Sequence, residues 1–407
     1  MNKTNFTSLI LLLITFISCS SPDQTKQQSM LLDVPFETDS TKTYGEPYLM
    51  TSATGQTYMS WIEREGNNAE LRYTYFDEEK WKSPQSIASG NNWFINWADY
   101  PQIASKDGKS MLSFFLQKSG SSTYAYDIQY LSTLDGKNWT APKTLHDDGL
   151  QAEHGFVSML PYDGNYLISW LDGRNSAGQM DHHNHQSGSM AAMTLRAAIL
   201  SPEGEKLQEW EIDNRTCDCC QTSVALTNNG PVVVYRDRGI TETRDIAISR
   251  LIHGKWTTPK IIFLDNWQIK GCPVNGPRAA SKNNSLAVAW FSAAKGLPEV
   301  KVIFSRDGGE NFENPIKINA APSIGRVDIV MIDESTAYIS WMENGEIKAK
   351  KVHQNGTSEE AITIAKTTEE RSSGFPQMTI AKEGLLFAWT DTEGKSTSIK
   401  SKLLKTQ

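Results

Sequence analysis

Residues 51–61 (TSATGQTYMSW) and 103–115 (IASKDGKSMLSFF) share the pattern that decides the fold. In each, a polar turn leads into an apolar run that ends on a small residue followed by an aromatic. Turn residues beside short runs of β-prone side chains are typical of a β-hairpin. Each stretch therefore predicts the first turn and the second strand of a repeating unit.

The same ending recurs along the whole chain. A small residue or Val precedes an aromatic at seven places, 48 to 65 residues apart, namely Trp61, Phe114, Trp170, Tyr235, Trp290, Trp341 and Trp389. A third and a fourth run follow, and the fourth often begins with Trp and a nearby Pro, as at Trp81, Trp139 and Trp256. Four strands in about 50 residues, repeated around a ring, predict a β-propeller.

The number of units predicts an all-β fold of seven four-stranded blades. No sustained 3.6-residue apolar period occurs, so we expect little helix. The last unit, residues 375–407, has room for about three strands, and residues 31–38 (LLDVPFET) look like a strand without a unit. We expect this N-terminal strand to complete the last blade, which would close the ring and remove a free edge. A six-bladed ring is the alternative, if one unit is an insertion.

Length and composition agree with a single propeller domain over residues 31–407. The chain has 407 residues, 39% hydrophobic and 21% charged, which argues against disorder, collagen and coiled coil. The formal net charge of −7 argues against a nucleic-acid partner, because such binding rests on clustered Lys and Arg. We therefore expect no nucleic-acid partner, and we expect a monomer.

The first 30 residues predict export and a lipid anchor. Residues 1–18 are typical of a signal peptide, because Lys3 precedes an apolar run that is too short for a membrane span of about 20 residues. Residues 16–19 (FISC) resemble a bacterial lipobox, with Phe16 in place of the usual Leu, so we expect lipidation of Cys19. Residues 19–30 would then be the lipidated Cys and a flexible polar tether. We expect an extracytoplasmic lipoprotein, anchored in a bacterial membrane and most simply the outer one; an ordinary signal peptide with an incidental Cys is the alternative.

Two turns carry a motif with a family resemblance. Residues 305–312 (SRDGGENF) match the Asp-box pattern S-x-D-x-G-x-x-[W/F], and residues 133–139 (TLDGKNW) form a shorter version. In such a turn the Asp caps backbone amides, Gly takes a positive φ, and the aromatic packs between blades. Over residues 35–400 the chain resembles the sialidase (neuraminidase) superfamily of propellers, and more closely bacterial exported sialidase-like proteins with BNR repeats. The phrases NWADYPQ, EHGFVS, SWLDGR, CDCCQTS, VVVYRDR and CPVNGPR also carry this resemblance.

The sequence departs from sialidases in two respects. The F-R-I-P tetrapeptide, whose Arg holds the substrate carboxylate in that superfamily, is absent, and the nearest matches, residues 99–102 (DYPQ) and 375–377 (FPQ), have no Arg. Known sialidases of the superfamily resemble six-bladed rings, whereas this sequence has seven units. The resemblance therefore implies activity on a glycan more strongly than it implies specificity for sialic acid.

Polar residues at the openings of the first strands and at the ends of the second strands predict a site in the funnel of the ring, where these positions converge. Glycoside hydrolysis needs a proton donor, a nucleophile or base, and often an Arg that orients an anion. We predict Asp99 and Glu153 as the acid/base pair, and Tyr235 or Tyr100 as counterpart of a sialidase Tyr nucleophile. The predicted substrate-binding residues are Arg174, Arg236, Arg238, Arg278, Arg326 and His154. The alternative is that these side chains pair structurally across blade junctions.

Cysteines and histidines form a second predicted constellation. With Cys19 lipidated, an even number remains, and in an oxidising compartment Cys217, Cys219, Cys220 and Cys272 favour two disulfides. A thiolate site for Zn²⁺ or Cu⁺ and unmodified thiols are the alternatives. The long third unit contains His182, His183 and His185 among Met residues, which suggests a transition-metal site or a solvated loop over the funnel.

Three functions follow from these features. The first is an exported sialidase-like glycoside hydrolase that acts on a glycan, an anionic one in view of the Arg residues. The second is a non-catalytic propeller lipoprotein that binds a glycan or a protein at the cell envelope. The third is a metal-handling or redox lipoprotein that uses the Cys and His/Met groups. The first requires no cofactor, and the partners expected are a glycan and, through the lipid, a membrane.

Overall fold

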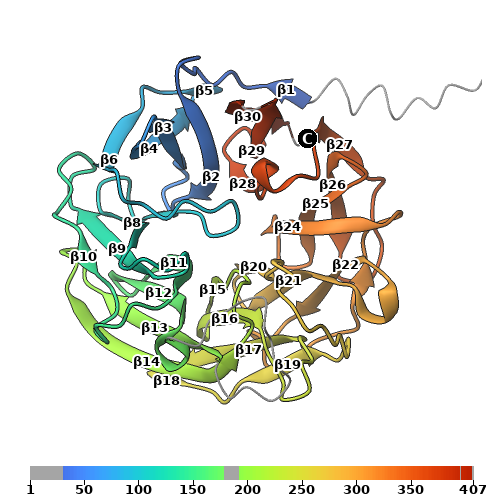
Figure 1. Cartoon of the computed structure of the whole chain (residues 1–407). Helices are drawn as coiled ribbons and strands as arrows, with labels where there is room; N and C mark the ends of the chain where they lie inside the picture. The colour runs from blue at the N-terminus through green and yellow to red at the C-terminus, as the bar shows by residue number, and fades with distance from the viewer. Residues whose placement is uncertain (1–30, 178–191, 395, 406–407) are drawn as a thin grey trace, which may run out of the picture.

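The repeat in the sequence forms seven antiparallel sheets arranged in a ring around a central axis (Figure 1). The structure is a computed structural model that describes residues 31–177, 192–394 and 396–405. Each sheet is one blade with its first strand next to the axis, so the predicted seven-bladed β-propeller is confirmed and the six-bladed alternative is wrong.

The first four blades contain strands β2 to β19. Blade 1 holds β2 (Thr43–Thr51), β3 (Thr57–Glu65), β4 (Asn68–Asp77), β5 (Lys80–Trp81) and β6 (Gln85–Gly90). Blade 2 holds β7 (Ile103–Ser105), β8 (Met111–Lys118), β9 (Tyr126–Thr133) and β10 (Lys143–Thr144). Blade 3 holds β11 (His154–Tyr162), β12 (Asn165–Asp172), β13 (Met193–Leu200) and β14 (Lys206–Thr216). Blade 4 holds β15 (Ser223–Thr227), β16 (Gly230–Arg236), β17 (Ile246–Ile252), β18 (Lys255–Trp256) and β19 (Lys260–Phe263).

The last three blades complete the ring. Blade 5 holds β20 (Arg278–Lys282), β21 (Ser285–Ser292), β22 (Glu299–Ser305) and β23 (Ile316–Lys317). Blade 6 holds β24 (Ser323–Met331), β25 (Thr336–Glu343), β26 (Glu346–His353) and β27 (Ile362–Lys366). Blade 7 holds β28 (Gln377–Ala381), β29 (Gly384–Glu393), β30 (Ser396–Leu404) and β1 (Leu31–Asp33). The described helices are three short 3₁₀ turns, η1 (Arg174–Ser176), η2 (Ala294–Gly296) and η3 (Arg371–Ser373).

Strand β1 closes the ring as its outermost strand in blade 7. It pairs antiparallel with β30, with Leu31 opposite Leu404. The pairing extends past the strand, because the Val34 amide donates to the Ser401 carbonyl at 2.9 Å and the Ser401 hydroxyl donates to the Val34 carbonyl at 2.8 Å. The predicted N-terminal closure is therefore confirmed.

The aromatics that end the second strands form the core between blades. Trp61, Trp170, Trp290 and Trp341 are at most 1% exposed. Second strands are buried on both faces, as in β25, whereas the outer strand β14 is mostly partly buried or exposed. At about 25 cal/mol per Å², burial of an aromatic of 150–250 Å² contributes about 4–6 kcal/mol before entropy is counted. This burial explains why the second strands are continuous apolar runs in the sequence.

The two turns with the Asp-box pattern connect third and fourth strands. Asp307 accepts the amides of Glu310 at 3.0 Å and Asn311 at 2.8 Å, while Gly308 and Gly309 have positive φ. Asp135 accepts two amides in the same way, both at 2.8 Å. The carboxylate thus accepts hydrogen bonds from backbone amides that have no carbonyl partner within the tight turn.

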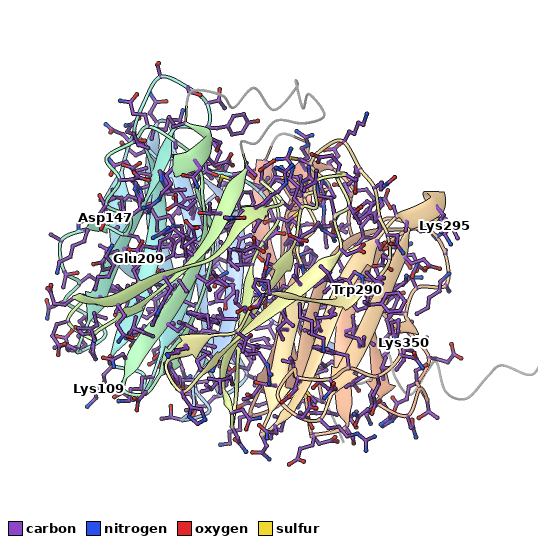
Figure 2. The ribbon with its side chains drawn as sticks, turned by 90° about the horizontal axis from the view of Figure 1, so that it is seen from below. Lys109, Asp147, Glu209, Trp290, Lys295 and Lys350 are labelled. Carbon is purple, nitrogen blue, oxygen red and sulfur yellow. The ribbon has the colours of Figure 1, made fainter. Side chains whose placement is uncertain are left out.

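The ring has two different faces. Figure 2 views it from the side, with Lys109 of the β7–β8 turn and Lys295 of the β21–β22 connection at opposite faces. Connections between second and third strands share a face with the links from one blade to the next, and we call this face the mouth. Among the described residues, no helix is long and apolar enough to cross a membrane.

Candidate functional site

The axis of the ring holds a small polar channel. A cavity of about 180 Å³ is lined by the innermost strands. Each blade contributes to it, through Tyr48, Gln102, Ser158, Ser223, Arg278, Asp328 and Met378. The predicted binding residue Arg278 pairs there with Asp328 at 3.0 Å and donates to the hydroxyl of Tyr100 at 3.3 Å. Arg278 therefore lies in the channel wall, and Tyr100 contacts the channel through Arg278.

Aromatic side chains from two blade-to-blade links stack on each other at the mouth. Trp97 stacks on Phe375 with 5.6 Å between ring centroids, and the guanidinium of Arg326 lies 4.7 Å from the Trp97 ring. Arg326 also donates to the carbonyls of Glu370 and Gly374, at 2.9 and 3.0 Å. Burial lowers the pKa of Arg326 to about 10. Arg326, which the sequence predicted to bind substrate, therefore instead binds backbone carbonyls of the segment between blades 6 and 7.

A repeated contact links consecutive blades at the mouth. A side-chain oxygen from one blade opening accepts a backbone N–H at the opening of the next blade. Three such pairs are Asp99 with Phe156 at 2.7 Å, Gln221 with Gly276 at 2.9 Å, and Asn275 with Arg326 at 2.7 Å. A neighbouring Gly leaves room for each, since a Cβ on Gly155 would lie 2.0 Å from Asp99 and one on Gly325 would lie 2.3 Å from Asn275. Asp99 therefore has a structural role, and a second carboxylate, Asp328, accepts the Met378 amide of the next blade at 2.7 Å in a similar way.

The two predicted acid/base carboxyls meet at a tyrosine. The Tyr126 hydroxyl lies 3.1 Å from Oδ2 of Asp99 and 2.9 Å from Oε1 of Glu153. Asp99 and Glu153 are 3% exposed and Tyr126 is 0% exposed. The structure thus brings Asp99 and Glu153 together, on either side of a hydroxyl that the sequence analysis did not select.

Protonation states in this trio follow from burial. Burial raises the pKa of Asp99 to about 8, and the Glu153 charge adds to the effect, although the Phe156 amide opposes it. Burial and the two nearby carboxyls raise the pKa of Tyr126 well above its usual value. At neutral pH Asp99 therefore keeps its proton and can donate it to the Tyr126 oxygen, while the Tyr126 hydroxyl donates to Glu153.

A second charged group adjoins Glu153 in blade 3. His154 Nε2 lies 2.9 Å from Asp148 and 3.7 Å from Asp172, and the His154 ring stacks on His146 with 3.5 Å between centroids. Arg174 binds Asp172 with its Nε at 2.8 Å and its Nη2 at 2.8 Å. Burial alone would lower the pKa of His154, but Asp148 and Asp172 reverse the sign and raise it. We call Asp99, Tyr126, Glu153, His154, Asp172 and Arg174 the blade 2–3 site.

Other predicted site residues have partners of their own. Tyr235 is fully buried and donates to Asp213 at 2.5 Å, and burial raises its pKa far above that of a ready nucleophile. Arg236 donates only to backbone carbonyls in the contacts observed, including those of Asn275 and Phe291. Arg238 pairs with Asp218 at 2.8 Å and Glu242 at 3.0 Å. In the described part of the chain, no two of the five predicted arginines share a side-chain partner.

The predicted metal and disulfide residues divide into two groups. Cys217, Cys219 and Cys220 carry thiols and lie together in the link between blades 3 and 4. The proposed pairing into disulfides stays a prediction. His182, His183, His185 and Cys19 lie outside the described residues.

Three residues in or beside the blade 2–3 site were not predicted from the sequence. Tyr126, His146 and Asp148 belong to neither a first-strand opening nor a second-strand end. Tyr126 begins the third strand of blade 2, which starts at the mouth, and a search extended to third-strand starts would have found it. His146 and Asp148 lie in the link between blades 2 and 3, where no periodic pattern marks them.

The ring and its mouth define a sialidase-like β-propeller. The sequence matches the BNR repeat-like domain family over residues 63–387, and the chain belongs to this family. Comparison with curated proteins gives no match.

Solved structures share the fold at low sequence identity. A protein of unknown function from Dyadobacter fermentans is 13% identical, with a TM-score of 0.51, over 93% of this chain and 100% of that chain. The polysaccharide lyase Uly1 is 10% identical, with a TM-score of 0.52, over 91% of this chain and 92% of that one. The NanB sialidase from Streptococcus pneumoniae is 12% identical, with a TM-score of 0.46, over 91% of this chain and 70% of that chain.

Proposed function

We propose that this protein is an exported glycan-acting lipoprotein, and that it hydrolyses a glycosidic bond at the blade 2–3 site. The observation that carries the proposal is the trio of Asp99, Tyr126 and Glu153 at the mouth. A glycosidase needs one carboxyl that keeps a proton near neutral pH and another that is ionised. A propeller fold alone does not fix this function.

In the proposed mechanism Glu153 is the catalytic residue and acts as acid/base on the glycosidic oxygen. Asp99 and Tyr126 are positioning residues, since the Tyr126 hydroxyl lies between the two carboxyls. The proton that Asp99 keeps, at a pKa of about 8, reaches Glu153 through the Tyr126 hydroxyl, and Glu153 passes it to the glycosidic oxygen as the bond from that oxygen to the anomeric carbon breaks. A water then adds to the anomeric carbon and returns its proton to Glu153.

An anionic glycan suits the cations beside this trio. The Arg174 side chain is 19% exposed, and its pairing with Asp172 fixes its direction. His154 directly follows Glu153 and has a raised pKa. A substrate carboxylate or sulfate could bind Arg174 in a bidentate manner.

The test uses the chain from Ser21 onward with a panel of fluorogenic glycosides and anionic polysaccharides. We expect turnover by the wild type, a loss of about 100-fold or more in kcat for Glu153→Gln, and about 10–100-fold for Asp99→Asn and Tyr126→Phe. The two positioning variants should also change the pH profile of kcat. Unchanged activity in Glu153→Gln would discard the proposed mechanism.

The natural Asn275 provides the folding control for Asp99→Asn. Asn275 makes with Arg326 the contact that Asp99 makes with Phe156. An asparagine side chain in place of Asp99 can therefore accept the same amide, and the variant should fold with an unchanged melting temperature near pH 4, where the Asp99 carboxyl of the wild type is protonated. Lower activity together with lower stability would instead indicate a structural effect.

The burial of the trio favours one other function. All three side chains are at most 3% exposed, and aromatics stack at the mouth nearby. A non-catalytic glycan-binding lipoprotein would have these properties. Binding of a glycan on an array without turnover of any polymer or glycoside would support this second function.

A further inference from the structure

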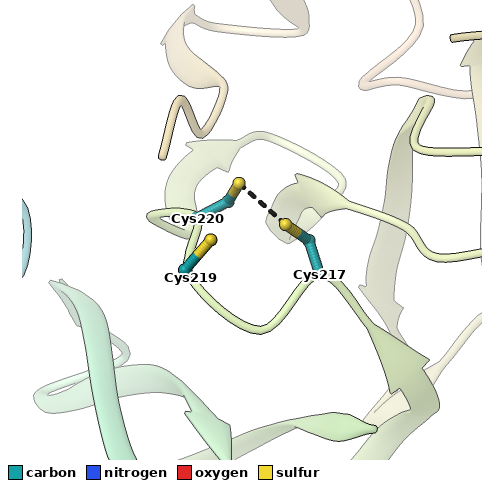
Figure 3. Close-up of side chains that lie close together, drawn as sticks. All are labelled: Cys217, Cys219 and Cys220. Carbon is teal, nitrogen blue, oxygen red and sulfur yellow. Dashed lines mark hydrogen bonds between the residues drawn. The ribbon is translucent and has the colours of Figure 1, made fainter. Parts of the chain in front are cut away.

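Three cysteine thiols converge in the link between β14 and β15. The sulfur atoms of Cys217, Cys219 and Cys220 all lie within 4.8 Å of one another, and those of Cys217 and Cys220 are 2.9 Å apart. Figure 3 shows the three side chains turned toward a common point, from a single short segment of chain. All three residues are at most 8% exposed.

A fourth thiol reaches the group from the next link. Cys272 lies between β19 and β20 and is partly buried. Its side chain hydrogen-bonds with the Cys219 thiol. Three converging sulfurs from one blade-to-blade link and a fourth that contacts Cys219 from the next link therefore lie at the mouth; we call the four residues the cysteine cluster.

The backbone that carries the first three thiols is held in place. The Cys217 amide donates to the Arg236 carbonyl at 3.0 Å. Asp218, the residue between the first two cysteines, pairs with Arg238 at 2.8 Å and accepts the Met193 amide at 3.2 Å. Because the Asp218 carboxylate binds Arg238 and the Met193 amide, it fixes the backbone between the cysteines. The thiols are therefore positioned before any metal ion binds.

The surroundings favour negative charge on sulfur. The guanidinium of Arg244 is fully buried and its Nη1 lies 3.2 Å from the Cys217 sulfur. This buried cation beside the sulfur supplies a positive charge opposite the negative charge that metal-bound sulfurs carry. A thiolate is the form of cysteine that binds metal.

We propose that Cys217, Cys219, Cys220 and Cys272 bind one thiophilic d¹⁰ cation, Zn²⁺ or Cu⁺. Converging thiolates are the preferred ligands of both ions. Two disulfides would also use all four sulfurs, but in the structure these four cysteines carry thiols. The buried Arg244 offsets part of the negative charge that a cluster of thiolates leaves around the ion. This proposal concerns a different set of residues from the glycosidase proposal and does not depend on it.

The ions are distinguished by titrating each into the chain from Ser21 onward, purified reduced and without oxygen. We expect about one Zn²⁺ or one Cu⁺ per chain by elemental mass spectrometry, held against a competing chelator. The ion that resists the stronger competitor is the one the cluster selects. Titration with Co²⁺ should add a thiolate charge-transfer absorption, and the bound ion should protect the thiols from alkylation.

Variants separate the cluster from the glycosidase site. Cys217→Ser and Cys220→Ser should lose the stoichiometric ion, and Cys272→Ser should weaken its binding at least 10-fold. Because a buried Ser could disturb folding, Cys272→Ser at the partly buried position provides the second variant, with its melting temperature measured. Asp99→Asn should bind the ion like the wild type.

Two results would overturn the proposal. One is a reduced, folded chain that retains neither ion after titration while its thiols stay open to alkylation. The other is a chain prepared from the periplasm whose intact mass is lower by the hydrogens lost in one or two disulfides, with no ion bound.

Discussion

Asp99 is the residue where structural and chemical roles are hardest to separate, and pH separates them. Its pKa is about 8 in the folded protein, well above the usual value, so the folded state binds a proton that the unfolded state has lost. Stability should therefore be lost as pH rises from about 4 to about 8. Asp99→Asn cannot ionise, so its free energy of unfolding relative to wild type should increase by a few kcal/mol between about pH 5 and pH 9. Denaturant titrations at both pH values measure this difference.

Asp307 provides a control because its pKa is shifted in the direction opposite to that of Asp99. Burial opposes ionisation there, but the Asn311 and Glu310 amides outweigh it and lower the pKa of Asp307. Its contribution to stability is present at neutral pH and is lost as the pH falls through the lowered pKa. Asp307→Asn should therefore be least stable relative to wild type at neutral pH. A parallel pH response in the two variants would contradict the assignment of Asp99 as a buried neutral acid.

Replacement of Gly155 should destabilise the blade 2–3 site directly. A Cβ there would lie 2.0 Å from Oδ2 of Asp99 and 2.9 Å from the Tyr126 ring. Gly155→Ala should lower the free energy of unfolding by about 2–4 kcal/mol, because the site is closely packed. At Gly271 the added methyl would meet nothing within 4 Å, so Gly271→Ala should stay within about 0.5 kcal/mol of wild type. Equal stability of the two variants in urea would contradict the contact geometry.

At the scale of elements, the short strand β1 contributes more than its length suggests. It covers the edge of β30, and the residues after it add Val34, which is buried, and Phe36, which packs edge-on against Trp61 at 4.9 Å. A chain that begins at Asp39 should lose this closure and expose the β30 edge to pairing with other molecules. We expect a melting temperature lower by several degrees and aggregation on heating, measured by calorimetry and light scattering. A chain that begins at Leu31 should match the longer form; equal behaviour of both truncations would show that closure is dispensable.

At the scale of the whole molecule, the repeat made the ring predictable and left the site only partly so. Seven buried aromatics at regular intervals report on local hairpins and on blade packing, and both follow from short-range sequence. Convergence at the mouth could also be predicted, and Asp99, Glu153, His154 and Arg174 do lie near one another there. Their partners could not, because Tyr126 and Asp148 are placed by tertiary packing that no periodic pattern records.

The arginines show most clearly which roles cannot be predicted from the sequence. An Arg at a strand end has the same sequence signature whether it binds a substrate or a backbone carbonyl. Arg236 and Arg326 are fixed by carbonyls of neighbouring links, and Arg238 holds the segment that presents the cysteine cluster. Only the three-dimensional contacts distinguish these roles.

The completeness of the ring leads to a prediction about anchoring. Within the described part of the chain, residues from 31 onward supply the strands of all seven blades, so we expect the ring to fold without residues 1–30. If Cys19 carries the lipid, Cys19→Ala should move the protein from the membrane fraction to the soluble extracytoplasmic fraction, because one lost acyl anchor removes most of the membrane affinity. Its melting temperature after detergent extraction should equal that of wild type. Ser20→Ala, next to the acceptor, is the matched control and should stay in the membrane. Retention of Cys19→Ala in the membrane after a salt wash would contradict the lipid anchor and would point to a protein contact on the ring itself.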